Sequence, residues 1–182
     1  DGTLPFHSII ALKAAINTHE RLYGPDPMTM ISQHTNFLGK RLYDAMSSLY
    51  HPNGIPVCPI STGASSTYGD SRTQGATVSF NVVRADRTYV PYVSVVETLA
   101  DRTNIYVRSG GLCNPGGIST HLGIDTWNMK RQWSYGYRCG SADKTGTEIM
   151  NGKPTGVVRV SLGAMTTIAN VDALITFLQE NF

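Results

Sequence analysis

A cysteine in a glycine-rich loop is the feature of this sequence best suited to nucleophilic chemistry. The segment reads Arg108-Ser-Gly-Gly-Leu-Cys113-Asn-Pro-Gly-Gly117, so four glycines and a proline surround the thiol. Small neighbours leave the sulfur accessible, and Arg108 would favour the thiolate, which is the form that attacks. The alternative is a tight loop whose cysteine only fills space, since free cysteines are often buried and inert. From the residues alone, both interpretations stay open.

An arginine near the C-terminal end is the second candidate. It lies in the alternating segment Thr155-Gly-Val-Val-Arg159-Val-Ser-Leu-Gly163, which is typical of a strand. Arg159 is expected on the face opposite Val158 and Val160, where a guanidinium can hold a carboxylate through two parallel hydrogen bonds. The alternative is an arginine on an ordinary solvated strand face.

The N-terminus and the other cysteines are weaker candidates. Gly2 and Thr3 precede a helix start, where a hydroxyl and free N–H groups can meet a phosphate, although threonine is also an ordinary helix cap. Cys113, His121 and Cys139 would need a fourth ligand to hold zinc, and they lack the close cysteine pair of structural zinc sites. We therefore predict no metal site.

The elements that position these residues follow from hydrophobic spacing and breakers. A helix is predicted from Pro5 to the breaker at 24–27, and a second from there to 51–54, with His34 on its apolar stripe as a core residue. Further elements are predicted in order: strands over 57–60 and 77–82, a helix over 93–100, a strand over 104–108, one or two helices within 121–137, a strand over 156–162, and a last helix capped by Asn170. Exposed or glycine-rich loops are predicted over 61–74 and 109–117. This order indicates an α+β fold, with helices packed on a small mixed or antiparallel sheet.

Composition limits the class of protein. The chain has 182 residues, 41% apolar and 15% charged, with a net charge of +2, which is typical of one soluble globular domain over 1–182. The cations are scattered, so no nucleic-acid or membrane surface is predicted, and no apolar run approaches the ~20 residues of a membrane span. Three cysteines are a sparse, odd set that favours a reducing compartment, most simply the cytoplasm. Helix-start residues within five positions of the first residue indicate a piece of a longer protein.

The order of the motifs resembles a known family. Gly2-Thr-Leu-Pro-Phe-His, Val107-Arg-Ser-Gly-x-x-Cys113 and Val158-Arg-Val-Ser-Leu-Gly163 are similar to the class V aminotransferase fold, within it to the cysteine desulfurase branch. Further details resemble eukaryotic molybdenum cofactor sulfurases: Cys113-Asn-Pro-Gly, His121-Leu-Gly-Ile, Asn151-Gly-Lys-Pro-Thr-Gly-Val-Val-Arg-Val-Ser, and Met165-Thr-Thr. The resemblance covers essentially the whole chain and implies the C-terminal part of an aminotransferase-like unit.

This resemblance implies roles for individual residues. Cys113 matches the cysteine that carries sulfur as a persulfide, and Arg159 matches the arginine that binds the substrate α-carboxylate, with Arg108 assisting. Thr3, together with Gly2, matches the segment that reaches the phosphate of pyridoxal phosphate, in many relatives across a homodimer interface. The lysine that anchors this cofactor is expected upstream of Gly2, outside this chain. Residues 1–23 would then be a helix that borders the missing cofactor-binding domain.

The implied activity is sulfur transfer from L-cysteine, releasing alanine, to the molybdenum cofactor or the enzyme that carries it. On this interpretation the chain alone is inactive. Two alternatives remain: a cysteine desulfurase or other class V lyase with a different sulfur acceptor, and an interaction module without pyridoxal phosphate or catalysis. Retention of both Cys113 and Arg159 favours catalysis over the second alternative.

Overall fold

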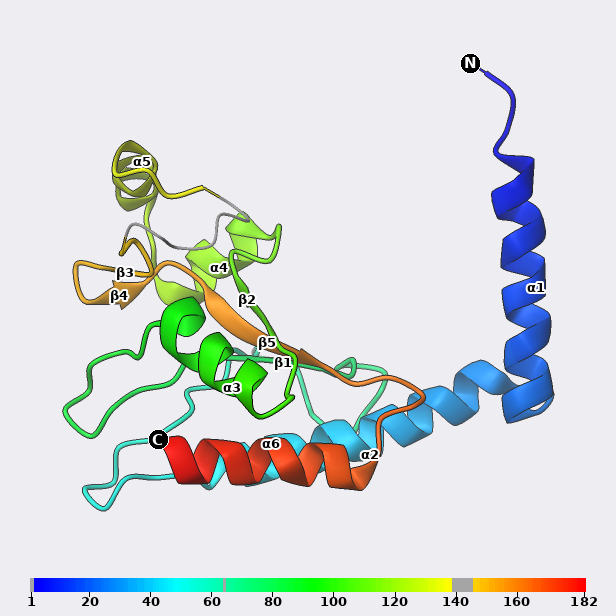
Figure 1. The fold of residues 1–182 in the computed structure, drawn as a ribbon, viewed down its shortest axis with the longest axis horizontal. Helices are drawn as coiled ribbons and strands as arrows, with labels where there is room; N and C mark the ends of the chain where they lie inside the picture. The colour runs from blue at the N-terminus through cyan, green and yellow to red at the C-terminus, as the bar shows by residue number, and fades with distance from the viewer. Residues whose placement is uncertain (1, 64, 139–145) are drawn as a thin grey trace.

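The computed structural model describes residues 2–63, 65–138 and 146–182, and it has an α+β fold (Figure 1). The elements in chain order are α1 Phe6–Tyr23, α2 Pro27–Ser47, β1 Thr77–Phe80, the π-helix η1 Tyr92–Glu97, α3 Thr98–Arg102, β2 Arg108–Gly110, α4 Pro115–Leu122, α5 Thr126–Ser134, β3 Ile149–Met150, β4 Lys153–Pro154, β5 Val157–Ser161 and α6 Ile168–Asn181. Of these described helices, none is both long and apolar enough to cross a membrane.

The main sheet has three strands in the order β1-β5-β2, and both pairs are antiparallel. Strand β5 is therefore central, although it comes last in the chain, and its partners come from two separate earlier segments. A second, two-stranded sheet is the β3–β4 hairpin. The predicted fold class is confirmed, and the sheet takes the antiparallel form.

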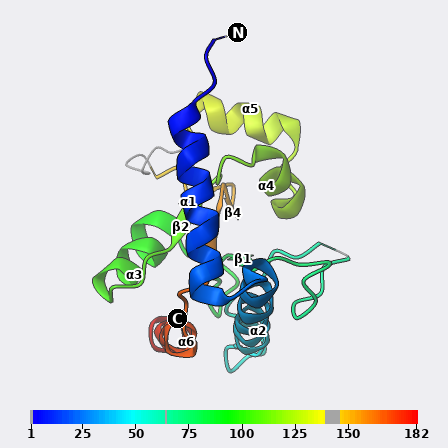
Figure 2. The ribbon, with the colours of Figure 1, turned by 90° about the vertical axis from the view of Figure 1, so that its right-hand side faces the viewer.

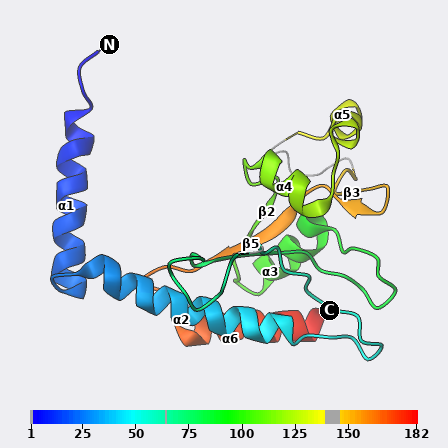
Figure 3. The same cartoon turned by 180° about the vertical axis from the view of Figure 1, so that it is seen from behind.

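One face of the main sheet is covered by helices. α2 and α6 lie side by side beneath it, and η1 and α3 extend this layer toward β2 (Figures 1 and 3). The side chains between the layers are apolar and at most 4% exposed, and they include Leu38, Leu42, Val78, Phe80, Val96, Val158, Val171, Leu174 and Leu178. This covered face holds the core, since burying apolar area is the main driving force of folding.

Helix α1 has no such cover. It extends away from the sheet, and none of its residues is buried (Figures 1 and 2). The apolar side chains that predicted this helix are each between 49% and 63% exposed: Phe6, Ile9, Ile10 and Ile16. The helix itself is confirmed, but none of its apolar residues is buried within the described part of the chain.

Several predicted boundaries shift. The strand predicted over 104–108 begins only at Arg108, because residues 101–105 turn back through hydrogen bonds to Ala100 and Asp101. Residues 57–60 do not form a strand. One bridge pairs Ile60 with Phe80, and a few backbone hydrogen bonds hold the segment beside β1, because Pro59 has no N–H to donate. Helix α4 begins at Pro115, inside the predicted loop 109–117.

Two predicted roles of polar residues are wrong. Thr167, not Asn170, is the N-cap of α6; Asn170 is its N3 partner in a reciprocal capping box. His34 is exposed rather than in the core, because burial along α2 begins only at Thr35 and the turns before it contain no buried residue. Its Nε2 is nevertheless paired, at 2.8 Å from the Thr166 carbonyl.

Candidate functional site

The candidate site lies on the face of the main sheet opposite the helical layer. Side chains alternate along β5, so Val158 points into the core while Arg159 points to the other face. The register places Arg159 directly opposite Arg108 of β2 and Ser79 of β1. Directly paired residues share a face, with Cβ atoms about 4.5–5.5 Å apart, so these three side chains form one row. We call this side of the sheet the open face; α1 and the α4–α5 pair flank it at opposite ends (Figure 1).

Two arginines paired across neighbouring strands need an anion. Like charges in this position repel, and neither Arg108 nor Arg159 forms an ion pair with any described residue. The Nε of Arg159 is buried and has no hydrogen-bond partner. A buried donor without a partner costs about 1–3 kcal/mol, which a bound carboxylate would relieve. The row therefore suits a small anionic ligand.

The Cys113 thiol is exposed beside this row. It lies in the four-residue connection 111–114 between β2 and α4, and its Sγ is 3.6 Å from Nη2 of Arg108. Cys113 and Leu112 both have left-handed backbone conformations, with φ of 56° and 54°. Such conformations are uncommon for residues other than glycine and concentrate at functional sites. The Arg108 guanidinium is thus positioned to donate a hydrogen bond to the sulfur.

Local contacts fix the shape of this connection. The side chain of Asn114 accepts a hydrogen bond from the N–H of Gly117 at 3.1 Å and caps α4, with Pro115 at the first helical position. On the other side, β2 and β5 approach closely: a Cβ at Gly156 would lie 2.5 Å from the backbone carbon of Gly110. Only glycine allows this approach, which holds the base of the Cys113 loop against the central strand.

Of the two remaining cysteines, only Cys58 lies among the described residues. Cys58 is 3% exposed in the core, and burial raises the pKa of its thiol to about 12, so it stays protonated and inert. Cys139 lies outside the described residues. The described residues contain no group of three or more potential metal ligands, but this leaves the combination of Cys113, His121 and Cys139 untested.

The structure brings Cys113, Arg108 and Arg159 together, but not Gly2 and Thr3. These two exposed residues precede α1 at its far end, away from the sheet (Figure 1). The first turn of α1 has no side-chain cap, and Pro5 occupies the N-cap position. Within one chain the proposed phosphate-binding segment and the arginine row are therefore separate.

Sequence reasoning missed two polar residues, one at the site and one that fixes β2 from the covered face. Ser79 joins the arginine row, and its position on the face opposite Val78 and Phe80 was readable from the alternation of β1. Glu97 accepts a hydrogen bond from the Ser109 hydroxyl and ties η1 to β2. No sequence signal predicts this second contact, because it depends on how η1 packs.

The fold is shared with a known class of enzyme structure. Over 98% of this chain and 32% of the other, it matches the apo structure of a cysteine desulfurase from Thermococcus onnurineus NA1, with a TM-score of 0.62 and 21% identity. This agrees with the predicted class V aminotransferase type of fold. No protein-family model matches the chain.

The sequence relatives indicate a narrower class of protein than the structural match does. The chain is 47% identical over 183 residues to a molybdenum cofactor sulfurase of Botryotinia fuckeliana and 44% identical over 180 residues to one of Chaetomium globosum. A molybdenum cofactor sulfurase of Aspergillus clavatus is 47% identical over 180 residues. These matches cover 99–100% of the chain but only 20–22% of each relative, so the chain spans about a fifth of their length. Its resemblance to molybdenum cofactor sulfurases is thus confirmed over its whole length.

Proposed function

We propose that this chain is the sulfur-carrying part of a molybdenum cofactor sulfurase, in which Cys113 takes sulfur from L-cysteine and passes it to the molybdenum cofactor. The observation that carries the proposal is the paired Arg108 and Arg159 beside the exposed Cys113 thiol. A sulfur-containing amino acid offers a carboxylate to the arginines and a sulfur atom to the Cys113 thiol. The sparse cysteines lead us to place this activity in the cytoplasm.

The residues present fit a pyridoxal phosphate enzyme on the substrate side. Pyridoxal phosphate, when bound, supplies the electron sink that weakens the carbon–sulfur bond of the substrate. Arg159, with its buried and unpaired Nε, would hold the substrate carboxylate, while Gly2 and Thr3 would contact the cofactor phosphate. Because α1 carries those two residues away from Arg159, a second copy would have to supply them, as in a homodimer.

The steps assigned to this chain are few. Arg159 fixes the carboxylate and so orients the substrate sulfur toward Cys113. The Cys113 thiolate attacks that sulfur: a sulfur–sulfur bond forms, the carbon–sulfur bond breaks, and the carbon retains the electron pair and takes up a proton to give alanine. Arg108 stabilises the anionic sulfur before and after this step. The terminal sulfur of the persulfide then leaves for the acceptor.

Arg159→Lys in the full-length protein tests the carboxylate clamp. Lysine keeps the charge but loses the two-pronged donor, and charge-assisted hydrogen bonds contribute roughly 1.5–3 kcal/mol each. We expect alanine release from L-cysteine to fall by about one to two orders of magnitude in kcat/KM, with an unchanged melting temperature. Unchanged kinetics would return Arg159 to an ordinary strand face. The isolated 182-residue chain should release no alanine, because the anchoring lysine is expected outside it.

The sulfur acceptor is tested separately. The structural neighbour is a cysteine desulfurase, so a related lyase with another acceptor shares the same first half-reaction. Transfer of labelled sulfur from the loaded protein to molybdenum cofactor supports the sulfurase. Normal alanine release without that transfer would indicate a different acceptor.

A further inference from the structure

We propose that Asn81 is a positioning residue of the sulfur site: its buried amide holds the start of β5 and so sets the place of the Cys113 loop relative to Arg159. This inference rests on the proposed function and adds to it a residue that does not touch the substrate. Asn81 directly follows β1 and is 3% exposed, and its Nδ2 donates to the Gly156 carbonyl at 2.9 Å. The two residues are 75 positions apart, so this bond is a tertiary contact.

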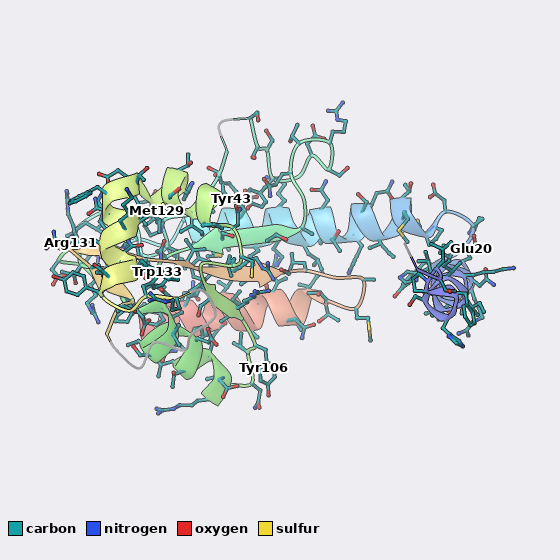
Figure 4. The ribbon with its side chains drawn as sticks, turned by 90° about the horizontal axis from the view of Figure 1, so that it is seen from above. Glu20, Tyr43, Tyr106, Met129, Arg131 and Trp133 are labelled. Atoms are coloured by element: carbon teal, nitrogen blue, oxygen red, sulfur yellow. The ribbon has the colours of Figure 1, made fainter. Side chains whose placement is uncertain are left out.

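The bond lies at an edge that all three strands of the main sheet share. Because both pairs are antiparallel, β1 and β2 end at this edge and β5 begins there, at the α5 end of the sheet and away from α1 (Figure 4). The last pair of β1 and β5 is Phe80 with Val158. The last pair of β2 and β5 is Gly110 with Val157. The Asn81 amide therefore holds strand ends, which are the parts of a ladder that open most easily.

The residue that Asn81 holds touches the base of the Cys113 loop. Gly156 lies against the backbone of Gly110 with no room for a Cβ between them. Gly110 precedes Cys113 by three residues, so only Gly111 and Leu112 come in between. Packed interiors transmit strain rather than absorb it, so a displacement of Gly156 reaches the thiol along this short path.

Asn81 is itself fixed, so its amide can act as a support. Its backbone N–H donates to the Pro59 carbonyl at 3.1 Å, which ties it to the segment beside β1. A side chain this deeply buried has few alternative rotamers in a packed surrounding. A buried donor that loses its acceptor is costly, which keeps the bond to Gly156 formed.

The residue before Gly156 is held by other parts of the chain. The Thr155 hydroxyl lies 2.7 Å from the Tyr92 hydroxyl and donates to the Thr147 carbonyl at 2.9 Å. Tyr137 donates to the Thr155 carbonyl at 3.2 Å. These contacts come from η1 and from the segments that follow α5, whereas the Asn81 contact comes from the end of β1. Together they fix the position of the start of β5.

The effect on the reaction follows from where its two groups are held. Arg159 lies in the middle of β5 and pairs with both neighbouring strands, so the carboxylate clamp depends little on the strand ends. Cys113 follows the end of β2, so loss of the Asn81 bond would change the approach of its sulfur to the substrate. Misplacing a reacting group by about 1 Å can cost about a hundredfold in rate. The bond therefore contributes to kcat rather than to KM.

Two substitutions in the full-length protein test this role. Asn81→Asp keeps the shape but replaces the donor by an acceptor, and Asn81→Ser leaves the Gly156 carbonyl out of reach. With pyridoxal phosphate and L-cysteine, we expect kcat for alanine release to fall by about one to two orders of magnitude in both, with KM changed by less than about threefold. Asn53→Asp is the matched control, because the Asn53 amide likewise donates to a carbonyl, that of Ala85 at 2.7 Å, in an exposed turn. Its kinetics should not change.

A variant that weakens the core away from this edge separates positioning from stability. Leu178 of α6 is fully buried, and Leu178→Ala should lower the melting temperature at least as much as Asn81→Ser does. Its kcat per folded molecule should nevertheless stay unchanged. An equal loss of kcat in Leu178→Ala would make Asn81 an ordinary structural residue.

Hydrogen–deuterium exchange measures the link between Asn81 and the loop without the reaction. In the same full-length proteins, residues 108–114 should exchange at least about fivefold faster in both Asn81 variants and at the unmodified rate in Asn53→Asp. Unchanged exchange in both Asn81 variants, or a normal kcat in both, would overturn the proposal. Faster exchange in a protein whose unmodified form releases no alanine would instead support the link and contradict the proposed function.

Discussion

The two faces of the main sheet are built from the same strands and differ in almost every physical respect. The covered face presents Val78, Phe80 and Val158 to the helices, all at most 1% exposed. The open face presents Ser79 and Arg159, the residues that follow Val78 and Val158, together with Arg108 of β2, and leaves a guanidinium nitrogen unpaired. Because alternation alone separates the two sets, one strand can be rigidly anchored through one face while the other is kept polar for a ligand.

The two described cysteines are the most extreme case of this comparison. Native protein treated with iodoacetamide at pH 8 should be labelled at Cys113, while Cys58 reacts more slowly by about two orders of magnitude or more. Burial keeps the pKa of the Cys58 thiol at about 12, so almost no thiolate forms at pH 8 and access is blocked as well. Peptide mass spectrometry over time measures both rates, and unfolding in urea should equalise them. Equal rates in the native state would contradict the distinction between the faces.

Truncation on the covered face should have the largest effect on stability. Phe80→Ala removes a ring that is 1% exposed, and we expect a loss of about 3–5 kcal/mol in the free energy of unfolding. Urea denaturation followed by circular dichroism measures it. Tyr106→Ala, at a side chain 80% exposed, is the control and should change stability by less than about 0.5 kcal/mol. A small loss at Phe80 would mean that the helical layer does not anchor the sheet.

The contact between β2 and β5 should have an intermediate effect. In Gly156→Ala the new methyl group would collide with the backbone of Gly110, so β2 must move, at a cost of about 1–3 kcal/mol. The same shift should change the labelling rate of Cys113, because β2 leads into its loop. Gly163→Ala meets no atom within 4 Å and should be nearly neutral. Thermal melts and the iodoacetamide assay check both variants.

The smallest effect on stability is expected at the open face. Arg159→Gln removes a charge that faces Arg108 and a buried donor without a partner, so stability should change by less than about 0.5 kcal/mol or rise slightly. Val158→Ala, its neighbour on the covered face, should instead cost roughly 2 kcal/mol. Comparable losses in the two variants, measured by urea denaturation, would show that Arg159 is structural.

Much of the fold could be predicted from local sequence. Helices α1 and α2 and strand β5 follow from periodicity and breakers, and the NG turn between β3 and β4 is a strong local signal. The errors lie where tertiary contacts decide. The start of β2 at Arg108 depends on pairing with β5, which is some fifty residues away, and the exposure of α1 depends on what packs against it.

The candidate site divides in the same way. Cys113, Arg108 and Arg159 were identifiable as types of residue in suitable segments, but their proximity depends on the strand order β1-β5-β2. The left-handed conformation of Cys113 carries no sequence signal, because neither it nor Leu112 is a glycine. Gly2 and Thr3 were grouped with the site only through family resemblance, and a single chain does not bring them to it.

The most direct test of the central claim is to locate the sulfur. The full-length protein is incubated with pyridoxal phosphate and L-cysteine, persulfides are trapped by alkylation, and peptides are analysed by mass spectrometry. We expect one extra sulfur atom on Cys113, unchanged labelling in Cys58→Ala, and none in Cys113→Ala. Extra sulfur on Cys58 or Cys139, or persulfide that survives Cys113→Ala, would contradict the assignment of the open face as the site of sulfur transfer.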